Sequence, residues 1–138
     1  MQRRTGDGPR PSRTKCVPAI PVISIIDDDP SVRAATYNLV RSFGYVVHTF
    51  ASAEAFLLSP RLAETSCVIA DVRMPAMSGL EMQAHLRAQG SGIPFIFITA
   101  LPDASVRTRA FEGGASGFLT KPFDEDALID CIDTALGR

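Results

Sequence analysis

The amino-acid sequence predicts a single α/β domain built on a parallel sheet of five strands. From Val22 onward, short apolar runs of strand length alternate with segments whose apolar residues recur at helical spacing. The first run, Val22–Ile26, is rich in β-branched residues, which is typical of a strand buried on both faces. The length of 138 residues suits one domain. Right-handed crossovers would then place helices on both faces of the sheet.

The first strand is expected at Val22–Ile26. Asp29 can cap the helix that follows, with Pro30 at its first position, and apolar residues at helical spacing continue until Gly44 ends the helix. The second strand is expected at Tyr45–Phe50, directly after this glycine. The beginning of the chain thus predicts one complete strand, helix and strand unit.

The middle of the chain repeats this pattern. Ser52 opens a short helix that ends before Pro60. The third strand is predicted at Cys67–Ala70 and ends at Asp71. A loop with proline, serine and glycine leads to a helix from Leu80 to about Ala88, which two nearby glycines close.

The last third supplies two further strands and helices. The fourth strand is predicted at Phe95–Ile98, and Asp103 caps a helix that runs through Phe111 to a pair of glycines. Gly117–Thr120 is the weakest strand prediction. Asp124 opens a final helix whose apolar residues form one stripe.

Charge divides the chain into two parts. Residues 1–20 contain one acid and five basic residues, a net charge of +4, whereas residues 21–138 have a net charge of −5. We expect a flexible basic extension over residues 1–20 and the folded domain over residues 21–138. The extension can attract phosphates, but without aromatic residues a solvated arm is favoured over a nucleic-acid contact. We reject a signal peptide because prolines interrupt the apolar run that follows the basic residues.

The composition also excludes several classes of protein. The chain is 46% hydrophobic and contains no apolar run of membrane-spanning length, so we expect a soluble protein without a membrane contact. Cys16, Cys67 and Cys131 lie far apart and form no metal-binding or redox motif. Cys67 and Cys131 are expected in the core. A reducing cytoplasm is therefore the expected location.

Polar residues stand at or just after the ends of the predicted strands. Asp27 and Asp28 follow the first strand, Asp71 the third, Thr99 the fourth and Lys121 the fifth. Each residue has an ordinary explanation as a cap, a loop residue or a solvated charge, and capping is the one we assign to the neighbouring Asp29. The carboxyl ends of parallel strands meet at one edge of the sheet, where ligands bind in such folds. Their joint occurrence therefore favours a functional site.

The chemistry of this site follows from its charge. Asp27, Asp28 and Asp71 would repel one another, so at least one pKa is expected to rise unless a cation intervenes. Mg²⁺ is a suitable cation, since it takes carboxylates, waters and phosphate oxygens. An aspartate placed beside such a metal and Lys121 can capture a phosphoryl group as an aspartyl phosphate. Thr99 could donate a hydrogen bond to that group.

Four segments of the sequence resemble the receiver domain of bacterial two-component response regulators, of the NarL/FixJ type. These segments are Ile25–Arg33, Asp71–Leu80, Ile98–Ala100 and Gly117–Phe123, and the resemblance covers residues 21–138. Their order and spacing make the resemblance specific. It implies a flavodoxin-like (βα)5 fold, doubly wound, with strand order 2-1-3-4-5.

The resemblance also implies roles for the clustered residues. Asp71 would be the phosphoacceptor, taking its phosphoryl group from a histidine kinase or a phosphotransfer protein. Mg²⁺ or Mn²⁺ would be bound by Asp28, by Asp71 and by the backbone carbonyl of Arg73, with Asp27 helping directly or through water. Lys121 would contact the phosphoryl group, and its peptide bond to proline would be cis.

A conformational switch is implied as well. Thr99 would turn toward the phosphoryl group and Phe118 would follow it inward, which would repack the face made by the fourth helix, fifth strand and fifth helix. This face is also the expected surface of a homodimer. The sequence departs from the family pattern at Ala76, where glycine is frequent, and at Phe118, where tyrosine is frequent.

The resemblance leaves the role of the whole protein open. After Leu136 only two residues follow, so we expect either a stand-alone receiver or the receiver of a transcriptional regulator, with no direct DNA binding by this chain. Self-catalysed phosphorylation and dephosphorylation would be its only chemistry, so it is not expected to be an enzyme. One alternative is a haloacid-dehalogenase-like phosphatase, although Arg73 stands where such enzymes have a second aspartate. Another is a receiver-like interaction module that works without phosphorylation.

Overall fold

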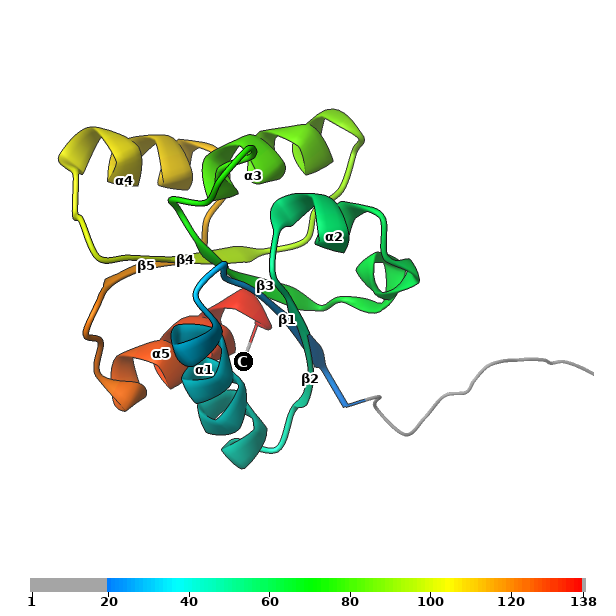
Figure 1. Ribbon diagram of the computed structural model, residues 1–138, viewed down its shortest axis with the longest axis vertical. Helices are drawn as coiled ribbons and strands as arrows, with labels where there is room; N and C mark the ends of the chain where they lie inside the picture. The colour runs from blue at the N-terminus through cyan, green and yellow to red at the C-terminus, as the bar shows by residue number, and fades with distance from the viewer. Residues whose placement is uncertain (1–19, 138) are drawn as a thin grey trace, which may run out of the picture.

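The structure, a computed structural model, describes residues 20–137. Five parallel strands form one sheet in the order β2-β1-β3-β4-β5, as Figure 1 shows. The strands are β1 (Val22–Ile26), β2 (Val46–Phe50), β3 (Cys67–Asp71), β4 (Phe95–Thr99) and β5 (Gly117–Thr120). The predicted fold class and strand order are therefore confirmed.

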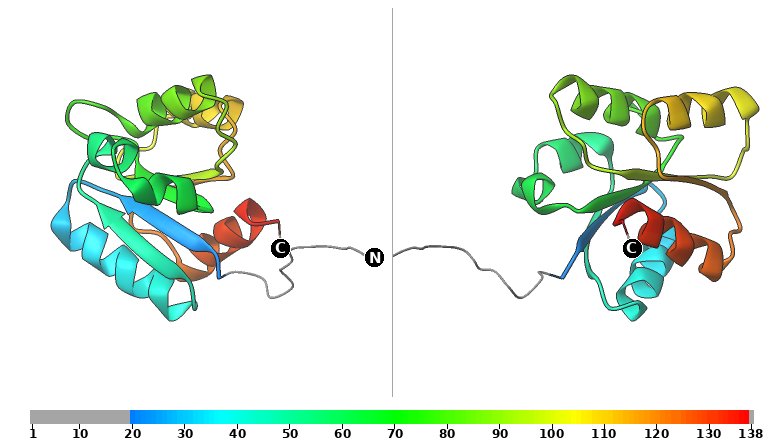
Figure 2. Two further views of the ribbon diagram at one scale, coloured as in Figure 1. Left: turned by 90° about the vertical axis from the view of Figure 1, so that its right-hand side faces the viewer. Right: turned by 180° about the vertical axis from the view of Figure 1, so that it is seen from behind.

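Helices cover both faces of this sheet. They are α1 (Pro30–Ser42), α2 (Ala53–Leu57), α3 (Gly79–Ala88), α4 (Ala104–Glu112) and α5 (Glu125–Ala135). Helices α1 and α5 lie on one face, and α2, α3 and α4 lie on the other (Figures 1 and 2). This three-layer arrangement leaves the carboxyl ends of the strands open at one edge. The predicted basic extension, apart from Ile20, lies outside the described residues.

The ends of the helices follow from local hydrogen bonds. The side chains of the predicted caps accept hydrogen bonds from backbone N–H groups in the first turn of each helix. These caps are Asp29, Ser52, Asp103 and Asp124. Helix α3 has a reciprocal capping box, in which the Ser78 side chain accepts from Glu81 and the Glu81 side chain accepts from the Ser78 N–H. These caps fix where each helix begins after its strand.

The observed elements differ from the prediction at their ends. Asp71 and Thr99 are the last residues of β3 and β4 rather than the first residues after them, and Tyr45 precedes β2. A 3-10 helix, η1 (Pro60–Glu64), was not expected. Ser59 caps it and a proline occupies its first turn. Because none of its residues is buried, no apolar pattern indicated it.

Two apolar cores separate the helices from the sheet. On the α1 and α5 side, Ile25 and Ile69 pack with α-helical residues such as Val40 and Leu128. On the α2, α3 and α4 side, the core contains the next residue of each of these two strands, Ile26 and Ala70. Larger apolar side chains fill the rest of this core. β1 is thus buried on both faces, as its composition predicted, and so is β3.

The cysteines in the described range are free thiols. Cys67 is fully buried in the core and Cys131 is half-buried beside it, so their expected place in the core is confirmed. Burial, with a smaller contribution from Cys131, raises the pKa of Cys67 to about 12. This pKa keeps Cys67 a neutral core thiol at physiological pH. Cys16 lies outside the described residues.

The helices of the described range do not have the properties of membrane-spanning helices. Over residues 20–137, none of them combines the length and the apolar character that crossing a bilayer requires.

Ala76 has a strained backbone in the loop between β3 and α3. Its φ angle is 67°, in the left-handed region that disfavours side chains with a Cβ. The N–H of Met77 donates to the carbonyl of Pro75 at 2.8 Å, so a tight turn is centred on Ala76. The departure noted at this position in the sequence therefore places an alanine where glycine would be relaxed.

Replacing Ala76 by glycine should stabilise the protein. The relief of a left-handed alanine exceeds the greater chain entropy of glycine, so we expect Ala76→Gly to raise the free energy of unfolding by about 0.5–1 kcal/mol. Ala84→Gly, an exposed position within α3, is the matched control and should lower it by about 1 kcal/mol. Urea unfolding measures both. Destabilisation by both substitutions would contradict the strain at Ala76.

Candidate functional site

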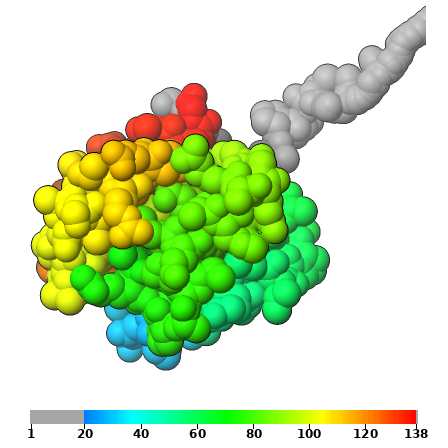
Figure 3. Space-filling view, turned by 90° about the horizontal axis from the view of Figure 1, so that it is seen from above, coloured from blue at the N-terminus to red at the C-terminus, as the bar shows by residue number. Residues whose placement is uncertain are grey.

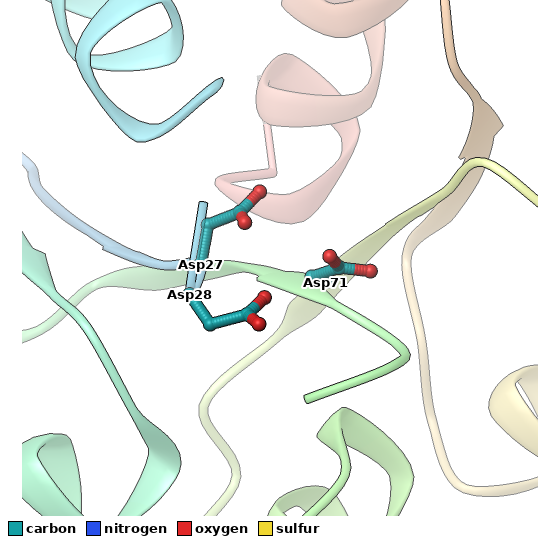
Figure 4. A group of neighbouring side chains, drawn as sticks. All are labelled: Asp27, Asp28 and Asp71. Carbon is teal, nitrogen blue, oxygen red and sulfur yellow. The ribbon is translucent and has the colours of Figure 1, made fainter. Parts of the chain in front are cut away.

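Three carboxylates gather at the open edge of the sheet. Asp27 and Asp28 follow β1 and Asp71 ends β3, and one oxygen from each can lie within 4.8 Å of the others. Figure 4 shows the three side chains at the ends of the two neighbouring strands, with those of Asp27 and Asp28 extending to the side where Asp71 lies. Asp27 is buried, Asp71 is half-buried and Asp28 is exposed. The structure thus brings together the acidic residues that the sequence singled out.

The strand order explains why they meet. β1 pairs with β2 on one side and with β3 on the other, and Ile26 stands opposite Ala70 in the register. The chain therefore leaves β1 and β3 toward opposite faces of the sheet, which opens a crevice between their carboxyl ends. Asp27 and Asp71 are the next residues after the paired positions. The topology alone places their side chains at the mouth of the crevice.

Lys121 bridges two of the carboxylates. Its Nζ lies 3.3 Å from Asp27 Oδ2 and 3.3 Å from Asp71 Oδ2. The backbone N–H of Lys121 donates to the Thr99 carbonyl at 2.8 Å, which fixes the residue after β5 against the end of β4. The peptide bond between Lys121 and Pro122 is cis, as the resemblance implied. One ammonium group thus connects β5 to β1 and β3.

Backbone and arginine donors hold the aspartates in place. Asp27 Oδ1 accepts the Asp29 N–H at 2.9 Å, and Asp71 Oδ1 accepts the Arg73 N–H at 3.2 Å. Arg33, in the first turns of α1, donates from Nη1 to the backbone carbonyl of Asp27 at 2.7 Å. Sequence reasoning assigned no role to Arg33. Arg33 follows Asp27 by six residues, a spacing that fits the passage from a strand into a helix. No sequence pattern, however, shows that its acceptor is a backbone carbonyl.

Gly79 is a second residue whose role was missed. A Cβ at this position would lie 2.5 Å from the carbonyl oxygen of Asp71 and 3.0 Å from the Phe97 ring. The Gly79 N–H donates to the Val72 carbonyl at 3.0 Å, so α3 begins in close contact with the end of β3. Only glycine allows this approach. Gly79 therefore helps to set the position of the Asp71 backbone.

Burial raises the pKa of Asp71 above its ordinary value, and the charge of Asp27 adds to this rise. The Arg73 N–H and the charge of Lys121 act in the opposite direction but do not cancel it. The expected rise is present in the cluster. Its largest cause is desolvation of the carboxylate rather than the repulsion that the sequence suggested.

Lys121 responds in the complementary way. Although burial disfavours its ammonium form, the charges of Asp27 and Asp71 and its hydrogen bonds to both raise the pKa of Lys121. The side chain is therefore a fixed positive charge at neutral pH. It can neutralise negative charge on any group that approaches Asp71.

Thr99 and Phe118 lie near the cluster but outside it. Thr99 is buried, and its Oγ1 accepts the Leu101 N–H at 3.1 Å and donates to the Leu101 carbonyl at 3.2 Å. Phe118 stands opposite Phe97 on β5, half-buried against the core on the α2, α3 and α4 side. The hydroxyl is thus engaged by the loop before α4, and the Phe118 ring is part of the core below.

The donor set fits a hard divalent cation. Carboxylate oxygens from Asp27, Asp28 and Asp71 lie close enough to share one ion, and Mg²⁺ and Mn²⁺ both prefer such ligands. Because Asp28 is exposed, water molecules can reach an ion at this site and complete its ligand set. The arrangement is chemically suited to an acidic metal site open to a phosphate-containing ligand.

The fold and the site together define a class of protein. A flavodoxin-like parallel sheet with an acidic, lysine-bridged site at its topological switch point belongs to the doubly wound α/β domains that bind ligands at this edge. A family model described as "Response regulator receiver domain" matches residues 23–133. This chain belongs to the response regulator receiver family, the signalling domains of bacterial two-component systems.

Known proteins place it near the NarL/FixJ type. The response regulator protein TodT of Pseudomonas putida is 45% identical over 115 residues, which is 83% of this chain and 51% of TodT. The structure of the response regulator StyR has a TM-score of 0.79 with 46% identity, covering 86% of this chain and 60% of StyR. A structure of FixJ-N has a TM-score of 0.78 with 30% identity, covering 87% and 96% respectively. The chain spans about half the length of TodT.

Membership in this family decides what kind of protein the domain is. Receivers of response regulators are signalling domains rather than classical enzymes, obtain phosphoryl groups from histidine kinases and bind Mg²⁺ at an acidic cluster. In this chain Asp27, Asp28 and Asp71 form an acidic cluster that could hold such an ion.

The raised pKa of Asp71 predicts a pH-dependent gain in stability for Asp71→Asn. The folded state holds the Asp71 proton more tightly than the unfolded state does, so stability falls as the pH rises from the ordinary pKa through the raised one. This loss persists at neutral pH, and the neutral asparagine escapes it. Without divalent ions, Asp71→Asn should therefore be more stable than the wild type at pH 7, with a smaller difference at pH 4.

Urea unfolding at the two pH values in the presence of a chelator measures this effect. The control is Asp130→Asn, which removes the same charge from an exposed position of α5. A variant that is less stable than the wild type at pH 7, or a gain that grows toward pH 4, would contradict a burial cost at Asp71 that exceeds its contacts with Lys121 and Arg73.

Proposed function

We propose that this domain is a phosphoacceptor switch, with Asp71 as the residue that receives the phosphoryl group. The observation that supports this most strongly is the placement of Asp71 between Lys121 and two further aspartates. The Lys121 ammonium lies 3.3 Å from Asp71 Oδ2 and two carboxylates can share a metal with it. Such a site can bind the oxygens of a phosphoryl group from two sides. The proposed receiver extends over residues 21–138.

The proposed reaction is a direct transfer. A carboxylate oxygen of Asp71 attacks phosphorus, the bond between phosphorus and the donor nitrogen of phosphohistidine breaks, and the nitrogen keeps the electron pair. Positioning and charge neutralisation are the main contributions that a protein makes to such transfers. Water later attacks the aspartyl phosphate, which returns the free carboxylate and releases phosphate.

Each residue of the site has a distinct part in this proposal. Asp28, Asp71 and the backbone carbonyl of Arg73 would hold Mg²⁺ or Mn²⁺, with Asp27 binding directly or through water. The ion supplies positive charge against the phosphoryl oxygens when it is bound. Lys121 supplies the second positive charge, since it can keep its contact with Asp27 while it shifts toward the phosphoryl group.

The switch begins at the hydroxyl of Thr99. At present this hydroxyl donates to the Leu101 carbonyl. A phosphoryl oxygen on Asp71 is a charged and therefore stronger acceptor, so the hydroxyl would turn toward it and release the loop before α4. Phe118 would then move inward and change the face formed by α4, β5 and α5. Because β5 is the edge strand, this change is presented at the side of the sheet.

Several partners follow from this mechanism. The donor is a sensor histidine kinase or a phosphotransfer protein, and the α4, β5 and α5 face is the proposed surface of a phosphorylation-dependent homodimer. Phe111 of α4 and Leu101 before it expose large apolar side chains that suit such a contact. We place the domain in the cytoplasm and expect it not to bind DNA directly.

The two alternatives have less support. A haloacid-dehalogenase-like phosphatase needs an acidic residue two positions after its nucleophile, where this chain has Arg73, and the family match is to receivers. A module that works without phosphorylation has no need for a lysine that bridges two aspartates. The phosphoacceptor function explains both features.

Phosphorylation by a small donor tests the proposal. With Mg²⁺ and acetyl phosphate, the wild type should gain one phosphoryl group that is stable in acid and lost in base, because acyl phosphates hydrolyse rapidly in base. Asp71→Asn should gain none, and Asp130→Asn should be labelled like the wild type. Intact mass spectrometry measures all three. An unmodified wild type, or equal labelling of Asp71→Asn, would exclude Asp71 as the acceptor.

A phosphoryl analogue tests the switch. Beryllofluoride with Mg²⁺ should shift the NMR signals of the Phe118 ring in the wild type, since the ring is expected to move when Thr99 does. In Thr99→Ala the analogue should still bind, but the Phe118 signals should stay close to their free positions. Phe43 at the end of α1, outside this face, is the internal control for solvent effects. Binding that leaves Phe118 unchanged in the wild type would contradict this mechanism.

A further inference from the structure

A long groove runs between α3 and α4, from the loop after β3, which contains Arg73, to Gly113. Two adjoining cavities form it, with volumes of about 510 and 540 Å³. The first begins at the loop after β3, the second ends at Gly113, and they share Leu80 and Arg109. Figure 3 looks onto this face, where α3 in green and α4 in yellow lie side by side. We refer to the combined hollow as the α3–α4 groove.

The floor of the groove is formed by small residues whose positions are fixed by a contact between the two helices. Ala84, Ala88 and Gly113 line its second part and leave space between the helices. Beneath them the buried Gln83 donates from Nε2 to the Ala110 carbonyl at 3.2 Å, which ties α3 to α4. A side chain at Gly113 would collide with Gln83. The groove is therefore formed before any ligand binds, so binding does not have to open it.

Positive charge dominates the walls. Among the described residues that line the groove, Arg73, Arg87 and Arg109 are basic and only Glu112 is acidic. Within residues 20–137, none of these three arginines forms an ion pair with a carboxylate; Arg87 donates to the backbone carbonyl of Glu112 at 3.2 Å. Most of the guanidinium donors are thus free for a ligand.

This charge contrasts with the rest of the domain. Residues 21–138 carry a net charge of −5, and α5 with its cap contains five acids and no basic residue. A basic groove on an acidic domain attracts a negatively charged group locally while the remaining surface repels it. The fitting ligand is therefore narrow, with its negative charge confined to the segment that enters the groove.

We propose that the α3–α4 groove binds an acidic segment of a partner protein. Carboxylates of the segment would pair with Arg87 and Arg109, and its small apolar side chains would lie over Ala84 and Ala88. A nucleic acid fits less well, because its continuous charge would meet the acidic surface and no lining residue in the described part of the chain is aromatic and able to stack on bases. Binding requires no phosphoryl group on Asp71, so this surface goes beyond the proposed function.

Titration with a model peptide tests this surface. The probe is a peptide of about ten residues with alternating glutamate and alanine, added to ¹⁵N-labelled protein. Amide shifts should concentrate in α3 and α4. Arg87→Gln with Arg109→Gln should weaken binding at least roughly tenfold, because two charge-assisted contacts are removed. Arg41→Gln with Arg61→Gln is the control, since it removes the same charge outside the groove and should change the affinity less than about twofold.

Four outcomes would overturn the proposal. The shifts could map outside α3 and α4, or both double variants could lose affinity equally, which would indicate non-specific attraction. A short DNA duplex could bind the groove more tightly than the peptide, which would indicate a nucleic-acid ligand. Sedimentation could reveal self-association that only Arg87→Gln with Arg109→Gln removes, which would assign the groove to a second copy of the chain. All four arginines are exposed, so folding of the variants is expected and their spectra report it.

Discussion

The contact of one ammonium group with two carboxylates is the interaction on which the site depends. Lys121 Nζ lies 3.3 Å from both Asp27 and Asp71. The two aspartates follow or end the adjacent strands β1 and β3, whereas Lys121 follows β5, which β4 separates from β3. Without this cation, a buried and a half-buried carboxylate would face each other where solvent screens them poorly. The ammonium therefore makes the parallel strand order, which forces the aspartates together, compatible with a stable fold.

The same lysine connects the acidic cluster to the part of the sheet that is proposed to switch. Its N–H is bound to the carbonyl of Thr99, so side chain and backbone of one residue contact both the cluster and the end of β4. A new negative charge at Asp71 would draw the ammonium away from its symmetric position. The movement of Lys121 would then displace the backbone around Thr99. Through Lys121 and Thr99, a local change of charge can thus reach the edge strand.

The sequence predicted the architecture and the cluster because both depend on patterns that are local. Strand ends can be read from apolar runs, and parallel strands must bring Asp27, Asp71 and Lys121 to one edge. The unpredicted features depend on three-dimensional approach. Arg33 binds a backbone carbonyl, which any residue could provide, and Gly79 is required by the closeness of the Asp71 carbonyl and the Phe97 ring. The α3–α4 groove was likewise invisible, since its arginines come from three separate segments.

Arg73 lies where the acidic site around Asp71 meets the α3–α4 groove, so binding at the two places is expected to be coupled. Its N–H holds Asp71 Oδ1, while the residue also lines the α3–α4 groove. If both proposals hold, an acidic segment in the groove and a phosphoryl group on Asp71 place negative charge beside the same loop. Linkage requires that phosphorylation change the affinity for the segment by the same factor by which the bound segment changes the phosphorylation equilibrium of Asp71. The sign of this coupling depends on which state of the loop the segment prefers, so the partner could regulate phosphorylation as well as detect it.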